Sequence, residues 1–165
     1  MSDNSQPTAL RPVVLQAGEG QTITAFGDTV VAKLTTVDTN GAFSLGLLTT
    51  PAHGGPPLHR HTREDELFLV ISGRFRFVCD GATHDVGPGG VVFLPRQTVH
   101  TYMALGPEPG QVWVLVLPGG FEKFFGRCAQ EFRPGVPPDP ALITKIGQDF
   151  GIEFLGPPLA ATAQD

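Results

Sequence analysis

Four residues of metal-ligand type occur at a spacing that could place them around one ion. His59 and His61 are separated by one residue, Glu66 follows five residues after the second histidine, and His100 comes from a separate apolar segment. Residues i and i+2 of a β-strand point to the same face, so His59 and His61 can direct two imidazole rings at one point. Glu66 can add an oxygen after a short polar bend. Three nitrogens and one oxygen suit a divalent transition metal, and Fe, Ni, Co, Mn, Cu and Zn all accept this set.

A metal at such a site leaves room for chemistry. Four protein ligands on an ion that accepts five or six leave one or two positions for water, O₂ or substrate. Glu66 is then the candidate catalytic base, because a carboxylate can accept a proton from a bound hydroxyl; the alternative is that Glu66 is a structural ligand only. A second interpretation is a former metal site, in which the four side chains only satisfy one another in the mouth of a barrel.

Other polar residues near these ligands are expected to have lesser roles. Glu64 and Asp65 lie in the bend and are expected to be solvated charges, and Asp65 becomes a rival ligand only if the strand register slips by one residue. His53, in the loop before the histidine pair, is a candidate for substrate binding, with an exposed loop histidine as the alternative. His84 is expected at the surface of a short polar hairpin.

The alternation of side chains along strands predicts what surrounds the ligands. Phe68 shares its face with Glu66, Phe77 points inward from the next segment, and Tyr102 shares its face with His100. We therefore predict Phe68, Phe77, Tyr102 and His53 as substrate-binding residues; the Tyr102 hydroxyl either contacts the substrate or bonds a backbone group. A pocket with mostly apolar walls suits a hydrophobic or aromatic small molecule. The large apolar residues expected in the core rather than the pocket are Phe93, Trp113 and Leu115.

Short segments rich in β-branched and apolar residues, separated by turn residues, fill the chain from residue 21 to residue 117. The segments are 21–26, 29–36, 42–50, 58–61, 66–71, 73–79, 83–86, 91–95, 100–104 and 111–117. Turns are predicted at 38–41 and 80–81, and a hairpin across Ser72-Gly73. Many short strands at close spacing predict an all-β barrel or sandwich.

The pattern changes after residue 118. Phe121, Phe124, Phe125 and Cys128 follow the spacing of an amphipathic helix, and residues 140–150 predict a second helix that ends at Gly151. The expected organisation is a disordered tail at residues 1–12, a β-barrel at 13–118, and C-terminal helices with a tail at 119–165 packing on the barrel. The apolar face of the first helix either packs on its own barrel, covers the barrel mouth, or meets a partner.

Composition excludes several classes of partner. The net charge is −5 and no Lys/Arg block is present, which argues against nucleic acid and anionic membranes. The two cysteines, Cys79 and Cys128, lie in apolar surroundings outside any CxxC pair and are expected to be reduced and buried. No signal-peptide pattern and no apolar run of bilayer length occur, so a cytoplasmic protein is expected.

These ligands and strands resemble the cupin superfamily. Its first motif is a glycine, a spacer, HxH, three or four residues, a glutamate, six residues and a glycine. Here His59 and His61 form HxH, Glu66 follows after four residues, and Gly73 follows after six more. Gly54 stands five residues before His59, one residue closer than in the usual pattern.

The second cupin motif is also recognisable. Gly89, Pro95 and His100 stand at the spacing of the family. Gln97 replaces the usual glycine and Ala104 replaces the usual asparagine. Neither departure affects a ligand, and the first suggests a modified turn before His100.

The flanking segments 120–125 and 151–158 are similar to small single-domain cupins (monocupins) of the quercetin 2,3-dioxygenase-like group. The resemblance implies a double-stranded β-helix barrel with a C-terminal helical extension, a homodimer, and a metal-dependent dioxygenase acting on an aromatic or enolizable small molecule. It also implies that His59, His61, Glu66 and His100 hold the metal and that Glu66 takes the substrate hydroxyl proton. The alternatives are a non-oxidative isomerase, cyclase or lyase that uses the metal as a Lewis acid, and a ligand-binding cupin without turnover.

Overall fold

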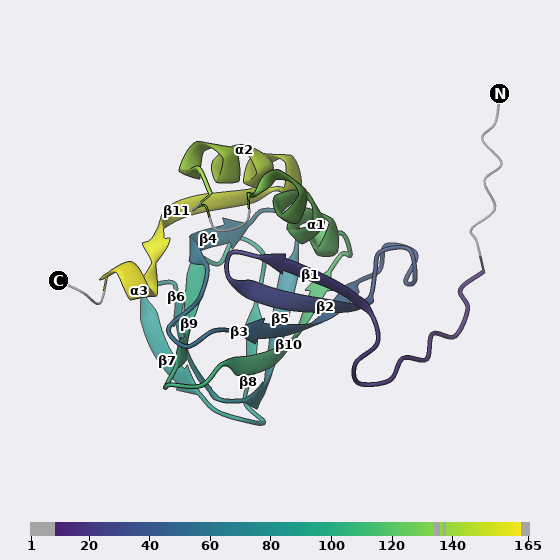
Figure 1. The fold of residues 1–165 in the computed structure, drawn as a ribbon, viewed down its shortest axis with the longest axis horizontal. Helices are drawn as coiled ribbons and strands as arrows, with labels where there is room; N and C mark the ends of the chain where they lie inside the picture. Colours follow the sequence, from purple (N-terminus) through teal and green to yellow (C-terminus); the bar gives the residue numbers. More distant parts are fainter. Residues whose placement is uncertain (1–8, 134–135, 137, 163–165) are drawn as a thin grey trace.

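The computed structural model describes residues 9–133, 136 and 138–162, which build two antiparallel β-sheets around a shared core (Figure 1). In spatial order, the six-stranded sheet consists of β1 Gln21–Ala25, β2 Asp28–Leu34, β3 Ser44–Thr50, β10 Gly110–Leu117, β5 Asp65–Ser72 and β8 Val91–Leu94. The five-stranded sheet consists of β11 Ile152–Pro158, β4 Pro57–His61, β9 His100–Leu105, β6 Arg74–Cys79 and β7 Ala82–Val86. This confirms the predicted all-β fold with a helical C-terminal region.

Strand alternation sorts the side chains between the core and the outside. On β10 the inward residues Val112, Val114 and Val116 are buried, whereas Trp113 and Leu115 are only partly buried on the outer face. Phe93 is 56 % exposed, so its expected place in the core is wrong. Side chains alternate along β8, and Leu94 points inward, so its neighbour Phe93 points outward.

The hairpin predicted across Ser72-Gly73 does not form. Strand β5 pairs with β8 and β10, while β6 pairs with β7 and β9, so the chain crosses from one sheet to the other at Gly73. Gly73 has a φ of +75°, and a Cβ there would lie 2.9 Å from Cα of Gly110, so glycine suits this corner. The turn at Asp80-Gly81 does form and connects β6 to β7, with positive φ at both residues.

The C-terminal helices are α1 Phe121–Glu131, α2 Pro140–Phe150 and the short α3 Leu159–Thr162. Asp139 caps α2 by accepting a hydrogen bond from the Ala141 amide, and Gly151 ends it in the left-handed conformation, as predicted. Figure 1 shows α1 and α2 together over one end of the sheets, next to β1 and β11. Phe124 of α1 is buried, so α1 packs on its own barrel. No helix in the described ranges is long and apolar enough to cross a membrane.

Strand β11 was not predicted from the sequence. It pairs with β4, with Ile152 opposite His61 and Phe154 opposite His59. Pro157 and Pro158 obscure the strand pattern, but β11 is an edge strand, where proline is tolerated because one side needs no backbone donor. The missed strand therefore supports the strand that carries both histidines.

The two ends of the predicted organisation are only partly covered by the described residues. Residues 1–8 and 163–165 lie outside them, and residues 9–12 have neither helix nor strand and are exposed. Both cysteines are free, in agreement with the prediction. Cys128 is fully buried, and burial raises the pKa of its thiol to about 12. Cys79 is partly buried, and burial raises its thiol pKa as well, so neither thiol is activated.

Candidate metal centre

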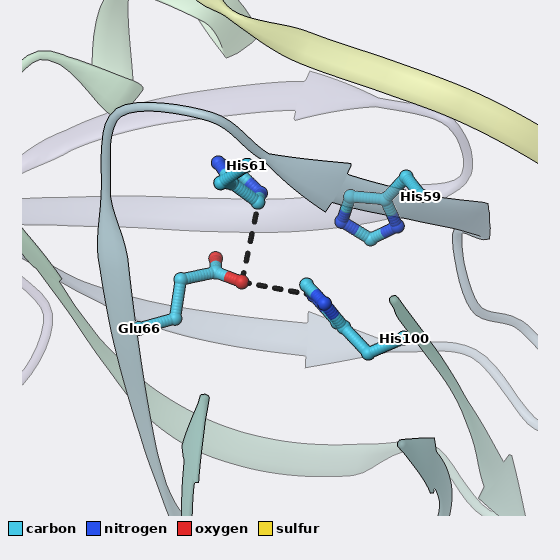
Figure 2. A group of neighbouring side chains, drawn as sticks. All are labelled: His59, His61, Glu66 and His100. Atoms are coloured by element: carbon cyan, nitrogen blue, oxygen red, sulfur yellow. Dashed lines mark ion pairs between the residues drawn. The ribbon is translucent and has the colours of Figure 1, made fainter. Parts of the chain in front are cut away.

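The four side chains singled out in the sequence converge inside the barrel (Figure 2). Strand β4 supplies His59 and His61, β5 supplies Glu66, and β9 supplies His100. Each residue offers one ligand atom, and these four atoms lie within 4.8 Å of one another. All four residues are buried, with exposed fractions of 7 % or less. A group of three imidazoles and one carboxylate thus faces a common point.

The atoms that face this point lack hydrogen-bond partners. Oε2 of Glu66 lies 3.0 Å from Nε2 of His100 and 3.5 Å from Nε2 of His61. None of these three buried atoms makes a hydrogen bond to another described residue. Because buried polar atoms in folded proteins are nearly always bonded, unpartnered atoms that share a focus fit a bound cation. The donor set fits a divalent transition metal.

The other ring nitrogens of two histidines are held by backbone carbonyls. Nδ1 of His59 lies 2.8 Å from the carbonyl oxygen of Pro57, and Nδ1 of His100 lies 3.0 Å from that of Thr98. A carbonyl only accepts, so Nδ1 carries the proton in both rings. Nε2 therefore keeps its lone pair toward the centre, as a metal ligand requires.

Glu64 holds the third histidine. Its Oε2 lies 3.3 Å from Nδ1 of His61, and its side chain is only 11 % exposed. The expectation that Glu64 is a solvated charge is wrong, because the bend between β4 and β5 folds it back onto the ring. Asp65 points away and binds Arg96 through both carboxylate oxygens, at 3.0 and 2.9 Å. The register therefore selects Glu66 as the carboxylate of the centre.

The pKa shifts in the cluster favour the deprotonated, metal-binding forms of His59 and Glu66 but not of His61. Burial lowers the pKa of His59 to about 3, assisted by the charges of His100 and His61, so this ring is neutral at physiological pH. Burial alone would raise the pKa of Glu66, but the neighbouring His61 and His100 lower it below its usual value. Burial opposes protonation of His61, yet Glu66 and Glu64 together raise its pKa. Protons and a metal therefore compete for this histidine.

A cavity with mostly apolar walls opens onto the centre. His59, Glu66 and His100 form part of its lining. The apolar part of the lining comes from both sheets and from α1, and includes Val30, Leu48, Phe68, Val114, Phe121, Phe124, Phe125 and Phe154. The rings of Phe121 and His61 lie 5.0 Å apart, so α1 covers one side of the centre as well as packing on the barrel.

Of the four predicted substrate-binding residues, two line the cavity and two do not. Phe68 and Tyr102 line the cavity. Phe77 is fully buried behind them, with its ring 5.4 Å from Phe68 and 5.5 Å from Tyr102. His53 lies exposed in its loop, with a φ of +59°. His84 is exposed on β7, as predicted.

One buried acid in the cavity wall was not predicted from the sequence. Asp28 is 4 % exposed and lies on the inward face of β2 with Val30 and Ala32. Burial raises the pKa of its carboxyl to about 6, although the nearby hydroxyl groups of Thr50 and Tyr102 oppose the shift. The sequence contained a signal for this acid. Asp28 stands at the i, i+2 spacing of the inward residues Val30 and Ala32, where an acid is unusual.

Comparisons with known proteins agree with this geometry. Residues 46–117 match the family model of the cupin domain. A quercetin 2,3-dioxygenase from Bacillus subtilis (strain 168) is 29 % identical over 119 residues, which cover 72 % of this chain and 35 % of that protein. The chain thus spans about a third of the length of this curated relative.

Solved structures show the same fold at low sequence identity. A predicted oxalate decarboxylase from Thermotoga maritima is 17 % identical, with a TM-score of 0.59 over 64 % of this chain and 99 % of that chain. A putative sugar phosphate isomerase from Acidithiobacillus ferrooxidans is 20 % identical, with a TM-score of 0.52 over 63 % of this chain and 74 % of that chain. At this level of identity the likeness concerns the fold alone, and the chemistry has to be argued from the residues of this chain.

Proposed function

Because this chain belongs to the cupin superfamily, we propose that it is a metal-dependent dioxygenase acting on an aromatic or enolizable small molecule, similar to quercetinases. In this proposal one divalent transition metal ion is held by the four buried residues of the candidate centre, His59, His61, Glu66 and His100. The observation that carries the proposal is the convergence of unpartnered His and Glu atoms on one point in a cavity wall.

The metal, when bound by these residues, would supply a Lewis acid that stabilises negative charge on a substrate oxygen. Glu66 has the role of proton acceptor for the substrate hydroxyl. Its pKa lies below the usual value because of His61 and His100, so it is ionised at neutral pH and able to accept the proton. Phe68 and Phe121 exclude water from the neighbourhood of the centre.

The cavity wall supports an apolar substrate. The lining includes phenylalanine rings from β5, β11 and α1, and such walls stabilise a flat aromatic ring better than a sugar. The ring centroids of Tyr102 and Phe68 lie 5.7 Å apart in the cavity wall, and both rings are proposed to contact the substrate ring.

The test is elemental analysis of the purified protein, followed by an oxygen-uptake screen with flavonols and other enols. We expect a metal near one per chain and oxygen consumption with at least one compound. Glu66→Gln should retain part of the metal and lose turnover. Glu131→Gln is the matched control, because Glu131 lies exposed on α1 and pairs only with Arg127 among the described residues.

Two outcomes would contradict the dioxygenase. Turnover that proceeds equally without oxygen would select a non-oxidative isomerase, cyclase or lyase. Tight binding of a compound that is recovered unchanged would select a ligand-binding cupin. Full activity in Glu66→Gln would remove the proposed role of this carboxylate as base.

We also propose a homodimer that uses the outer face of the six-stranded sheet. Leu67 pairs with Phe93 and Leu69 with Val91, which places apolar side chains next to one another across β5 and β8. Val91 is 57 % exposed and Phe93 is 56 % exposed. An exposed apolar patch at a sheet edge favours association, and a second copy of the same chain could cover it.

A further inference from the structure

Asp28 occupies an unusual place in the cavity. It is the first residue of β2, and its inward neighbours on the same strand are Val30 and Ala32. The same cavity is lined by His59 and Glu66 of the candidate metal centre. A second carboxylate therefore faces the space that a ligand would occupy.

The two oxygens of this carboxylate differ. Oδ2 accepts a hydrogen bond from the Tyr102 hydroxyl at 3.3 Å. Oδ1 is buried and has no hydrogen-bond partner among the described residues. The Oγ1 atom of Thr50 is also buried and has no hydrogen-bond partner among those residues. The wall thus contains a polar position that the chain itself leaves unsatisfied.

An unsatisfied carboxylate oxygen in an apolar wall is costly for folding. Buried acids are ordinarily paired or fully hydrogen-bonded, since an apolar interior does not supply the hydrogen bonds that water gives to a carboxylate. A side chain with no other role would be more stable here as an apolar residue of similar size. The cost is offset if a ligand delivers a donor to Oδ1.

The partner of Asp28 connects it to the metal centre. Tyr102 lies two residues after His100 on β9. Tyr102, Asp28 and Glu66 all line the same cavity.

We propose that Asp28 is a second ligand-binding position of this cavity, at which Oδ1 accepts a hydrogen bond from a hydroxyl group on an aromatic ligand. This deepens the proposed function, because it predicts a substrate with a hydroxyl group besides the oxygen that faces the metal centre. Ligands without that donor leave the carboxylate unsatisfied and bind more weakly.

Another acid in the cavity lining has a different role. Both the amide and the hydroxyl of Thr36 donate to Oε1 of Glu122, at 2.9 and 2.6 Å. This pair joins α1 to the segment after β2, so Glu122 anchors the helix through Oε1, while its Oε2 is buried without a hydrogen-bond partner among the described residues. Asp28 has no comparable bond to a backbone amide among the described residues.

The test uses binding without turnover. Phenol and anisole have the same ring, but anisole lacks the hydroxyl proton. Each is titrated into ¹⁵N-labelled protein loaded with Zn²⁺, which has no redox chemistry, and the affinities are read from amide shifts at pH 7.5. In the unmodified chain phenol should bind more tightly than anisole. In Asp28→Ala this ratio should fall about tenfold, as expected for losing a hydrogen bond to a charged group.

Three further variants make the outcome decisive. Asp28→Asn preserves the shape and should also reduce the ratio, so the proposal stays testable if the alanine variant does not fold. Tyr102→Phe leaves Asp28 in place and should keep the preference for phenol. Asp85→Asn removes a carboxylate that pairs with Arg76 on the outside of the barrel, and should bind like the unmodified protein.

The proposal is overturned by an equal phenol-to-anisole ratio in the unmodified and Asp28 variants, by no binding of either compound, or by a preference lost only in Tyr102→Phe. These results are independent of oxygen uptake. A chain that prefers phenol through Asp28 but consumes no oxygen with any enol would keep this inference and remove the dioxygenase.

Discussion

The carboxylate of Glu64 lies 3.3 Å from Nδ1 of His61, on the side of the ring that faces away from the candidate metal centre. His59 and His100 are held at the same ring position by carbonyl oxygens, so Glu64 is the one charged partner among these three contacts. A carboxylate behind a ligating histidine fixes the ring and increases its basicity.

Removing this carboxylate should weaken metal binding. We expect Glu64→Ala to lower the affinity for a divalent metal about 10- to 100-fold, because the His61 ring loses its anchor. Competition with a chromophoric chelator measures the change. Glu108→Ala, at an exposed loop position, is the control and should match the unmodified chain. Equal affinities for Glu64→Ala and the control would show that Glu64 does not support the ligand.

Replacing Asp28 should stabilise the protein at neutral and alkaline pH. The folded-state pKa of Asp28 is about 6 against 3.8 for an ordinary aspartate, so the folded chain binds more protons and loses stability as pH rises between these values. A shift of about 2 units corresponds to at most about 3 kcal/mol above pH 7. Well below pH 3.8 the carboxyl is protonated in both states and this cost is absent.

Urea unfolding of metal-free Asp28→Asn at pH 4 and pH 8 checks this sign. The gain in unfolding free energy over the unmodified chain should be larger at pH 8. Asp85→Asn should show no such gain, because the hydrogen bond from Arg76 lowers the pKa of Asp85 instead of raising it. A larger gain for Asp28→Asn at pH 4 would contradict the assignment of Asp28 as a destabilising buried acid.

Gly55 allows the loop before β4 to approach β9. A Cβ at this position would collide with the carbonyl oxygen of Tyr102 and lie 2.9 Å from its carbonyl carbon. The loop is held there by backbone hydrogen bonds of His53 and Gly54 to Ala104, so it cannot retreat without breaking them.

Gly55→Ala should therefore lower the free energy of unfolding by about 3 kcal/mol and weaken metal binding, because β9 carries His100. Gly87→Ala is the matched control, since nothing lies within 4 Å of a Cβ at that position. Thermal unfolding and a metal titration measure both effects. A Gly55→Ala variant as stable as Gly87→Ala would show that the loop has space to move.

Placing a charge on the outer face should disrupt the proposed dimer. Phe93→Asp puts a carboxylate in the exposed apolar patch of β8, where association would have to bury it. Light scattering after size exclusion should show a dimer for the unmodified chain and a monomer for the variant. Thr83→Asp on β7, an edge strand of the five-stranded sheet, should remain dimeric. A variant that stays dimeric would place the interface elsewhere.

Local pattern was sufficient for much of the candidate site. The i, i+2 spacing of His59 and His61 fixes a shared face once the segment is a strand, and the parity of Phe68 with Glu66 follows from the same rule. Turn residues such as Asp80-Gly81 identified the β6–β7 hairpin because their φ preferences act within a few residues.

Contacts between distant segments decided the rest. Ser72-Gly73 has the residues of a hairpin turn, but the sheet to which each flanking strand belongs depends on partners elsewhere in the chain, β10 and β8 for one and β7 and β9 for the other. Strand β11 exists because the edge of β4 is available to pair with it.

The sequence by itself determined the ligand types, their spacing and the alternation that turns them inward, since these depend on covalent order and strand geometry. The tertiary structure alone decided that Glu64 folds back onto His61, that α1 covers the cavity, and that Asp28 faces the same space as Glu66. Such proximity arises from packing between elements far apart in the chain, and a local pattern carries no information on that distance.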